Sequence, residues 1–449
     1  MKLQDALDIP DRGIVAFVGG GGKTSSLYRL ATELAATGHA RVLITPTTKM
    51  LLPGFDDADG LFIHPDLDAI ADRLDASLPF LRRVAIAPQV IETAEGWKLD
   101  SVPLDWPGRL VRLPRVAAVL VEADGSRHLS FKAPAAHEPP IPQDADVVVA
   151  VLGLDILGRP LDAAYVHRPE RIAALTGLPM GAPITIATVA AEMSHPEGGL
   201  KNIPSQARVL ALLNKATNDN IDDARALARC LLASPRFDGV AIGAVQAEPP
   251  LREVRRRVGA VILAAGGARR YGELKQTLPW EDSTLVGRAV KAALASEASE
   301  SVLVVGARAD EVLAAAGDGA IRVAHNSDWE QGLSTSVRAG LLSLSPSTHA
   351  ALFMLADQPK VTPSVVSALL QRYFETLAPI VVATYDGRRG NPTLFDRQLW
   401  PELMGVVGDQ GGRTLIDKYR DVVQFVEVGE AAALDIDTPD DYRRLMSSA

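Results

Sequence analysis

Residues 17–25 read FVGGGGKTS and join an apolar run at 14–18 to an amphipathic stretch at 24–38. The run is mostly β-branched and apolar throughout, as expected for a strand buried on both faces of a parallel sheet. The stretch that follows places its leucines and alanines on one helical face and ends at a glycine, which is typical of a helix. A glycine-rich turn between them lets backbone N–H groups point at phosphate oxygens. These residues predict a phosphate-binding loop that opens a parallel α/β domain.

Apolar runs of the same kind recur along the chain and define its organisation. They lie at 42–45, 84–87, 116–121, 147–152, 209–213 and 240–245, and then at 259–266, 302–305, 321–324, 350–356, 380–384 and 422–428. Helix-length stretches separate them, which predicts an α/β fold in both halves. Residues 246–257, QAEPPLREVRRR, break the pattern with prolines and a run of charges. The sequence therefore predicts domains at 1–248 and 258–449, joined by a linker at 249–257.

The composition excludes several classes of protein. Among 449 residues, 46 Lys and Arg against 55 Asp and Glu give a net charge of −9, which argues against a protein that coats nucleic acid. The single cysteine, Cys230, excludes an internal disulfide and fits a reducing, cytoplasmic location. The N-terminal MKLQDALDIPDRG lacks a signal-peptide pattern, and no apolar run approaches the length of a membrane helix. We expect a cytoplasmic protein with small-molecule ligands and neither nucleic acid nor membrane as partner.

The phosphate loop is expected to hold a nucleotide together with Mg²⁺. Its glycines, Gly20, Gly21 and Gly22, would supply backbone donors to the phosphates. Lys23 would reach the outer phosphates, and the hydroxyl of Thr24 would be a metal ligand.

Two later strands bear on the same nucleotide. The run at 116–121 ends in acids, and a carboxylate at that position can hold Mg²⁺; Asp124 is the first choice and Glu122 the second. Residues 211–217, ALLNKAT, approach a guanine-reading N-K-x-D pattern but have Thr217 in place of the aspartate. The loop itself departs from G-x-x-x-x-G-K-[ST] at Phe17. The choice between ATP and GTP therefore stays open.

A proline-rich loop within 122–142 follows the acidic strand end. Its basic side chains Arg127, His128, Lys132 and His137 are expected to bind an anionic ligand at the carboxyl edge of the sheet. Over about 14–245 the chain resembles the YqeC family, on GGGGKTS (19–25), TPTTKM (45–50), VEADGSRHLSFKAPAAHEPPIP (121–142), HRPE (167–170) and LLNK (212–215). That family is described as an accessory protein of selenium-dependent molybdenum hydroxylases. The resemblance implies a nucleotide-binding fold and makes a molybdenum hydroxylase apo-enzyme a candidate partner.

A second glycine turn opens the second half, at 260–275, AVILAAGGARRYGELK. Gly266 and Gly267 end a strand, and basic residues that include Arg270 and Lys275 follow. A nucleotidyltransferase needs this composition, because the glycine backbone approaches a triphosphate while the cations neutralise the reacting phosphate and the leaving pyrophosphate. Two acids are expected to hold Mg²⁺: Asp357, after the run at 350–356, and Asp437 in LDIDTPDD (434–441).

This half resembles the molybdenum cofactor cytidylyltransferases of the MobA-like nucleotidyltransferase superfamily over about 258–448. The family opens with L-A-A-G-x-S-x-R-M-G-x-x-K. This chain departs from it at Ala268 and Tyr271 and has in register Leu263, Ala264, Ala265, Gly266, Arg270, Gly272 and Lys275. Further matching segments lie at 325–340, 356–359, 389–395 and 408–413.

The resemblance implies a fold, a reaction and a set of site residues. The fold is two three-layer α/β domains, an N-terminal P-loop-like parallel sheet and a C-terminal Rossmann-like, glycosyltransferase-A-like sheet. The second domain would transfer CMP from CTP to a molybdopterin-type cofactor, with nucleotide contacts from 263–267 and Lys275. The methyl group of Ala265 favours CTP over GTP, and Asn391 and Arg413 would contact the pterin. Two alternatives stay open: an NTP-switched cofactor chaperone, and a transferase that uses another phosphorylated acceptor or GTP.

Overall fold

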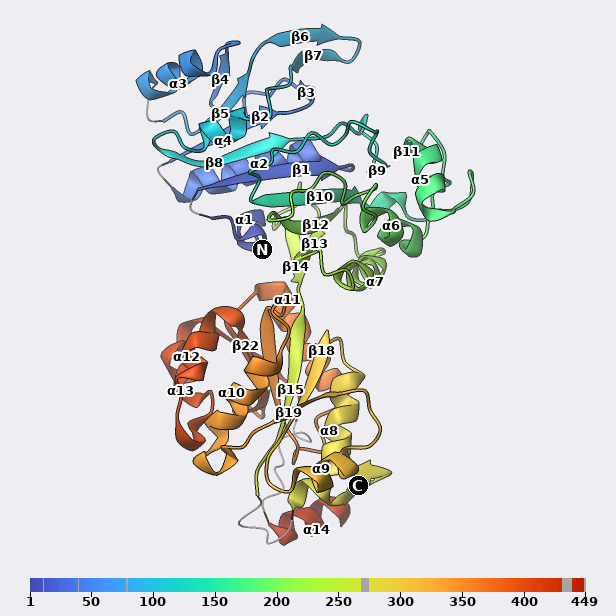
Figure 1. Cartoon of the computed structure of the whole chain (residues 1–449), viewed down its shortest axis with the longest axis vertical. Coiled ribbons are helices and arrows are strands. Elements are labelled where there is room, and N and C mark those ends of the chain that lie inside the picture. Colours follow the sequence, from blue (N-terminus) through green and yellow to red (C-terminus); the bar gives the residue numbers. More distant parts are fainter. Residues whose placement is uncertain (11, 39, 78–79, 268–273, 430–437, 448–449) are drawn as a thin grey trace. The chain divides into compact units, whose positions relative to one another are not determined.

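The computed structural model of this chain describes residues 1–10, 12–38, 40–77, 80–267, 274–429 and 438–447 (Figure 1). The chain divides into two compact units, Met1–Arg255 and Arg256–Ala449. Both are α/β units built on sheets dominated by parallel strands, so the predicted fold class is confirmed. Within the described part of the chain, no helix has the length and apolar character needed to cross a membrane.

The N-terminal unit is built on a nine-stranded sheet in the order β14-β13-β12-β10-β1-β8-β2-β5-β4. All neighbours pair in parallel except β13 and β14. Each apolar run predicted in this half corresponds to one of these strands, although the run at 240–245 extends beyond the end of β13 at Gly243. Their bounds are β1 Gly13–Gly19, β2 Arg41–Pro46, β4 Gly60–Ile63, β5 Arg83–Ala87, β8 Val116–Glu122, β10 Val147–Gly153, β12 Arg208–Asn214, β13 Gly239–Gly243 and β14 Leu251–Arg255.

Helices pack on this sheet and bury its apolar side chains. The helix expected at 24–38 is α2, Lys23–Thr37, which packs against β1, β2, β5 and β8. The others are α1 Leu3–Leu7, α3 Leu67–Ala76, α4 Trp106–Leu110, α5 Pro169–Thr176, α6 Ile186–Met193 and α7 Ile221–Leu232. Short strands were missed by the sequence pattern because they have too few residues to show a period: β3 Met50–Leu51, β6 Val90–Thr93, β7 Gly96–Leu99, β9 Phe131–Lys132 and β11 Val166–His167.

The predicted linker at 249–257 is wrong in its central part, because β14 lies there and pairs antiparallel with β13. The charged residues of this segment gave no apolar pattern from which a strand could be predicted. Glu253 is buried and accepts hydrogen bonds from Arg225 Nη2 on α7, at 2.9 Å, and from Arg255 Nε, at 2.8 Å. A run of charges that would be solvated in a linker is thus neutralised inside the fold. Only the tertiary partner on α7 distinguishes the two cases.

The C-terminal unit has a seven-stranded sheet in the order β19-β18-β15-β20-β22-β21-β23. Strand β22 is antiparallel to both neighbours, β20 and β21. It contains the matching segment 389–395, RGNPTLF, for which the family resemblance implied a substrate contact at Asn391. The bounds are β15 Val258–Ala264, β18 Glu300–Val305, β19 Arg322–His325, β20 Ala350–Leu355, β21 Ile380–Tyr385, β22 Arg388–Asp396 and β23 Val423–Glu427.

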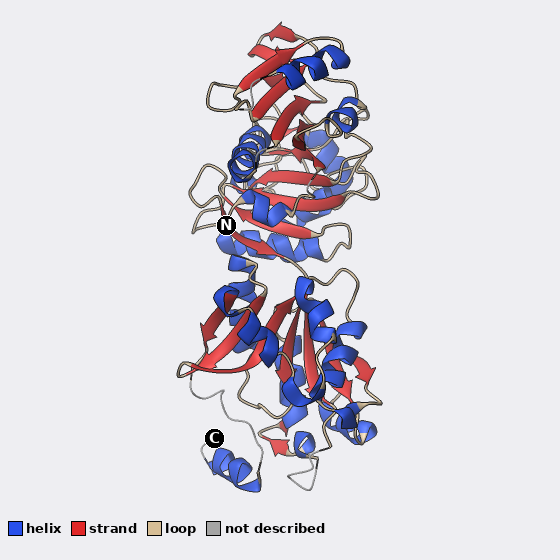
Figure 2. Ribbon diagram, turned by 90° about the vertical axis from the view of Figure 1, so that its left-hand side faces the viewer, coloured by secondary structure: helices blue, strands red, loops and turns tan. Residues whose placement is uncertain are grey.

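Three layers follow from the alternation of side chains along the central strand β15. Ala260 and Ile262 belong to a core shared with α8, α9 and α11, whereas Val261 and Leu263 belong to a core shared with α10, α12 and α13. Figure 2 shows helices on both sides of the strands in this unit. The helices are α8 Leu285–Leu294, α9 Ala309–Ala316, α10 Leu333–Ser343, α11 Pro363–Thr376, α12 Trp400–Met404, α13 Arg413–Lys418 and α14 Pro439–Ser447, and a small hairpin joins β16 Pro279–Trp280 to β17 Ser283–Thr284.

The buried ion pairs of β14 predict a strong effect on stability. Glu253→Ala leaves the guanidinium of Arg255, whose side chain is 3% exposed, without this carboxylate. Removing one partner of a buried pair costs about 3 kcal/mol or more. We expect the unfolding transition of the N-terminal unit, followed by urea titration of the full chain, to shift by that amount. Glu248→Ala removes a carboxylate that is 79% exposed and paired with Arg29, and is the matched control. Equal shifts for the two variants would contradict the assignment.

Candidate functional site

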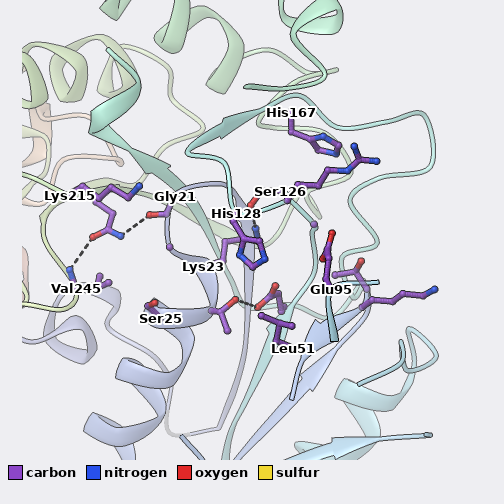
Figure 3. Close-up of a pocket in the computed structure, with 18 of the residues that line it drawn as sticks. Gly21, Lys23, Ser25, Leu51, Glu95, Ser126, His128, His167, Lys215 and Val245 are labelled. Atoms are coloured by element: carbon purple, nitrogen blue, oxygen red, sulfur yellow. Dashed lines mark hydrogen bonds between the residues drawn. The ribbon is translucent and has the colours of Figure 1, made fainter. Parts of the chain in front are cut away.

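An open cleft of about 750 Å³ lies in the N-terminal unit. Its walls are the segments that follow the carboxyl ends of β1, β2, β8, β12 and β13, which parallel pairing brings to one edge of the sheet. Ligands bind at this edge in open α/β sheets, where connections from neighbouring strands leave in opposite directions. The predicted phosphate loop and its basic surroundings therefore share one cavity. The labelled residues in Figure 3 outline it.

The glycines of the phosphate loop are required by close contacts. Gly21 has φ +80°, and a Cβ atom there would lie 2.3 Å from the backbone nitrogen of Gly153 on β10. Gly22 has φ +126°, and its Cβ would lie 2.3 Å from the side-chain amide of Asn214. Any larger residue would push the loop away from the strands that support it.

The structure changes which backbone donors are available to phosphate. The N–H of Gly20 donates to the Val151 carbonyl at 2.8 Å, and that of Gly21 donates to the Leu129 carbonyl at 3.0 Å. These two predicted phosphate donors are therefore directed into the fold. The N–H groups at the start of α2, from Gly22 onward, are the ones a helix leaves without an internal partner. The likeness of the loop to a phosphate cradle could be predicted, but which N–H groups face inward depends on the carbonyls of β10 and of Leu129.

Lys23 is buried at the base of the cleft, where its Nζ donates to the Gly19 carbonyl at 2.8 Å and to the Ser126 hydroxyl at 3.2 Å. Burial lowers the pKa of its ammonium group, and the carboxylates of Glu122 and Asp124 oppose this effect. A buried cation at this point attracts an anionic ligand because water screens it poorly.

The two candidate metal carboxylates have different surroundings. Thr24 Oγ1 donates to Glu122 Oε2 at 2.7 Å, and Glu122 lines the cleft. Both acids are buried, but Asp124, the first choice from sequence, does not line the cleft; it forms an ion pair with Lys132 and accepts from the Gly19 N–H at 3.1 Å. The geometry therefore favours Glu122. The sequence could not separate the two acids because the pairing with Lys132 is a tertiary contact.

Asn214, of the LLNK segment, anchors the far side of the loop, and its neighbour Lys215 is held by other segments. Asn214 Nδ2 donates to the Gly21 carbonyl at 2.8 Å, and its Oδ1 accepts from the Val245 N–H at 3.0 Å (Figure 3). Lys215 Nζ donates to Ser130 Oγ and pairs with Asp155, each at 2.8 Å. Asn214 is thus a structural clamp between β12, β13 and the loop.

The predicted basic loop separates into two groups. Arg127 and His128 line the cleft, whereas Lys132 is buried between Asp124 and Glu138, and the side chain of His137 is 83% exposed. The cleft is also lined by His167 and Arg168, which the sequence did not single out although the HRPE motif contains them.

Glu138 links this wall to the interior. Its carboxylate accepts from both terminal nitrogens of Arg168, at 2.7 and 2.8 Å, and from Lys132 Nζ at 2.9 Å. Burial alone would raise the pKa of Glu138, but these hydrogen bonds hold it at about 2. Burial, with the cations of Arg168, Lys132 and Arg127, lowers the pKa of His167 to about 4, so this ring is neutral at pH 7.

In the C-terminal unit, β15 and β20 are parallel neighbours, and the predicted residues follow their carboxyl ends. Lys275 Nζ lies 2.5 Å from Asp357 Oδ2. The second oxygen, Asp357 Oδ1, is buried and accepts no hydrogen bond from the described residues. The predicted residues Arg270 and Asp437 lie outside the described residues.

The second glycine turn differs from the first. A Cβ atom at Gly266 would meet no described atom within 4 Å, and one at Gly267 would lie 2.8 Å from the Trp329 ring. Gln276, which sequence reasoning missed, supports the turn by donating from Nε2 to the carbonyls of Ala264, at 3.2 Å, and Gly266, at 2.9 Å. The methyl group of Ala265 is buried close to Gly306.

A cavity of about 380 Å³ in this unit brings together three predicted residues: Leu263 from β15, Asn391 from β22 and Arg413 from α13. Apolar side chains such as Phe353 and Phe395 line it as well. At its rim, Arg389 Nη1 pairs with Asp417 Oδ1 at 2.6 Å. Polar and apolar side chains share the lining, so the cavity suits an organic ligand that has both polar and apolar groups.

Magnesium fits both sites by the chemistry of their donors. The described ranges contain no group of three or more His, Cys, Asp or Glu side chains placed so that they could hold a metal ion by themselves. Mg²⁺ next to a nucleotide usually takes one or two carboxylates, with phosphates and water as its other ligands. Asp357 Oδ1 in one unit, and Glu122 with Thr24 in the other, are donors of this kind.

Comparison with known proteins identifies both halves. A family model described as YqeC protein matches residues 15–170, and one described as MobA-like NTP transferase domain matches residues 260–422. The uncharacterized protein YqeC of Escherichia coli (strain K12) is 33% identical over 207 residues, which cover 45% of this chain and 75% of that protein. The chain belongs to the YqeC family.

The second half of this YqeC-family chain has relatives of its own. Nicotine blue oxidoreductase of Paenarthrobacter nicotinovorans is 32% identical over 197 residues, which cover 42% of this chain and 96% of that protein. Molybdenum cofactor cytidylyltransferase of Escherichia coli (strain K12) is 29% identical over 190 residues, which cover 41% and 93%. Both resemblances inferred from sequence are confirmed, and the C-terminal unit is a nucleotidyltransferase of the MobA-like class.

One buried acid beneath the phosphate loop was not anticipated. Glu192, at the end of α6, is 2% exposed, and its Oε1 has no hydrogen-bond partner among the described residues. It lines a small cavity with Gly19, Gly20 and Asp124. Burial raises the pKa of Glu192 to about 8, so the folded protein holds this carboxyl protonated at neutral pH.

The raised pKa of Glu192 predicts a pH-dependent stability. The unfolded chain releases this proton above about 4.5, whereas the folded unit retains it up to about pH 8. The folded state binds more protons in this window, so the free energy of unfolding falls as the pH rises. Glu192→Gln removes this contribution, and we expect its stability relative to wild type to increase from pH 5 to pH 8.5 in denaturant titrations. The control is Glu197→Gln, at a side chain that is 63% exposed. A difference that does not vary with pH would refute the assignment.

Proposed function

We propose that the C-terminal unit is a molybdenum cofactor cytidylyltransferase, which transfers CMP from CTP to the phosphate of a molybdopterin-type cofactor and releases pyrophosphate. The observation that carries the proposal is the Lys275–Asp357 pair at the carboxyl ends of β15 and β20 in a MobA-like domain. The cytidylyltransferase relative supports the choice of CTP and of the acceptor. A second argument is the methyl group of Ala265 next to the glycine turn, which would narrow the space beside the base and so favour a pyrimidine over the guanine of GTP.

The roles of the residues follow from the charges of the reaction. The acceptor phosphate is already an anion, so no strong general base is required. Lys275 and Arg270 would neutralise charge that develops on the α-phosphate and the leaving pyrophosphate, which is the main source of catalysis when the groups are fixed in place. Asp357, with Asp437, would hold Mg²⁺, which supplies further charge neutralisation at the phosphates when bound.

The adjacent cavity is the candidate acceptor site. Its apolar walls would cover the faces of a pterin, while Asn391 offers an amide to the polar edge of the ring and Arg413 offers a cation to an anionic group. The cavity lies between strands β15 and β22 and helix α13, and so is supported by rigid elements.

The central test is pyrophosphate release from CTP in the presence of molybdenum cofactor, with Asp357→Asn as the variant. Loss of the carboxylate removes a metal ligand and the partner of Lys275, so we expect kcat to fall by about 10²–10³. Asp282→Asn changes an exposed acid paired with Lys291 in the same unit, and should leave kcat within twofold.

Three outcomes would overturn the proposal. One is wild-type protein that releases no pyrophosphate with molybdenum cofactor and Mg²⁺ present. Another is a preference for GTP or for a sugar phosphate. The third is reduction of an acceptor by NADH or NADPH, the reaction class suggested by the name of the nicotine blue oxidoreductase relative, in place of nucleotidyl transfer.

We further propose that the N-terminal unit binds ATP or GTP with Mg²⁺ and acts as a nucleotide switch in delivering the cofactor to a molybdenum hydroxylase apo-enzyme. The specific support is the glycine loop with Lys23 buried beside it, together with the Thr24–Glu122 contact at the start of α2. The two units would then carry out successive steps on one cofactor.

Lys23→Ala separates the two activities. The variant loses the cation that faces the phosphates, so we expect nucleotide affinity at the N-terminal unit to fall at least tenfold while cytidylyl transfer stays unchanged. Maturation of a co-expressed molybdenum hydroxylase should be lost in parallel. Lys291→Ala, at an exposed lysine of the other unit, is the control for simple loss of charge. Unchanged nucleotide affinity in Lys23→Ala would show that the loop is not a phosphate site.

A further inference from the structure

The N-terminal cleft extends beyond the phosphate loop. One side is formed by the loop and the start of α2, and the opposite side by residues 125–128, 167–168 and 48–49. Its volume, about 750 Å³, lies in the upper part of the range of about 300–1,000 Å³ seen for ligand pockets. The phosphates of a nucleotide would be held by the loop side alone. The residues of the opposite side therefore indicate which further ligand the cleft can bind.

The turn at 126–128 is held directly against the phosphate loop. Lys23 Nζ donates to Ser126 Oγ at 3.2 Å, which ties the turn to the loop lysine. The next two residues, Arg127 and His128, have φ +51° and +63°. Left-handed backbone at a non-glycine residue costs about 1–3 kcal/mol, and such strain concentrates at ligand sites. The side chains of both residues line the cleft, and Figure 3 labels His128.

Most acids of this wall are already neutralised. Glu138 pairs with Arg168 and Lys132, and Glu95 pairs with Lys98 at 2.5 Å. In contrast, Lys49 and Arg127 form no ion pair within the described ranges. Acids lie near enough to interact with their charges, Asp100 with Lys49 and Glu95 with Arg127 and His128. The wall therefore presents an excess of positive charge in a chain whose net charge is −9.

We propose that Lys49, Arg127 and His128 form a second anion-binding subsite that holds a phosphate monoester in the cleft at the same time as the nucleotide. Two cations and an imidazole would bind a dianionic ligand better than they would bind a carboxylate ligand. The guanidinium of Arg127 can also bind two phosphate oxygens at once. The subsite rests on the nucleotide binding proposed for this unit and names the class of its second ligand.

The subsite is tested by calorimetric titration of inorganic phosphate into the full chain saturated with Mg²⁺ and a non-hydrolysable ATP or GTP analogue. The variants are Arg127→Asn and His128→Asn, because asparagine tolerates left-handed backbone and so preserves the turn. We expect each to weaken phosphate binding at least tenfold and to leave nucleotide affinity within twofold. The difference between wild type and variant isolates this subsite from phosphate bound elsewhere on the chain.

The matched control is His137→Asn, in the same loop but with a side chain that is 83% exposed and outside the cleft; it should bind phosphate as wild type does. Arg127→Lys should recover part of the lost affinity, which a folding defect would not allow. Unchanged phosphate affinity in Arg127→Asn and His128→Asn overturns the subsite. Nucleotide affinity that falls together with phosphate affinity also overturns it, because Arg127 would then belong to the nucleotide site.

Two further arms complete the test. Acetate titrated in place of phosphate should bind at least tenfold more weakly, and equal affinity would overturn the assignment to a phosphate monoester. If wild-type protein binds neither nucleotide analogue, the proposed switch fails. Phosphate titrated into Lys23→Ala, with and without Arg127→Asn, then tests the subsite by itself: a loss on Arg127→Asn supports it, and no loss overturns it.

Discussion

The N-terminal site depends on the contact between the backbone of the glycine loop and the backbone of β10. Gly20 donates to Val151, and a Cβ atom at Gly19 or Gly21 would lie 2.3 Å from atoms of that strand. Only glycine permits this approach, and two of the three have positive φ that other residues adopt at a cost. The contact fixes the loop from below and so directs the start of α2, with Lys23 and Thr24, into the cleft. Asn214 fixes the same loop from the β12 side.

The second glycine turn meets a different requirement. Among the described residues, no atom lies within 4 Å of a Cβ atom placed at Gly266, so none of the described strands packs against this position of the turn. Its support comes from the side chain of Gln276, which binds two carbonyls of the turn. The chemistry here is assigned to side chains, Lys275 and Asp357, and not to a helix N-terminus. The two turns have similar composition but are held in place by different contacts, the first by strand backbone and the second by a side chain.

In the N-terminal unit, ion pairing decides which charged side chains are available to a ligand. A connected set of ion pairs, from Asp124 through Lys132 and Glu138 to Arg168, runs from the underside of the phosphate loop to the far wall of the cleft. Each buried charge in it has a partner, as the cost of desolvation requires. The set removes Asp124 and Lys132 from ligand binding, although both belong to the motif that carries the family resemblance. Glu122, Arg127 and His128, which lie outside the set, line the cleft.

The sequence by itself determined the α/β class, most central strands and the location of both glycine turns, because buried parallel strands and glycine-rich turns have local patterns that need no partner to be recognised. It also selected Lys275 with Asp357, and Asn391 with Arg413, which the fold brings together. Only the tertiary structure decided which N–H groups of the loop face inward, which of Glu122 and Asp124 reaches the cleft, and that the charged run at 251–255 is a strand. Each of these depends on partners elsewhere in the fold: β10 and Leu129 for the N–H groups, Lys132 for Asp124, and Arg225 for the strand. Hydrogen bonds and ion pairs of that kind leave no periodic signal in the chain.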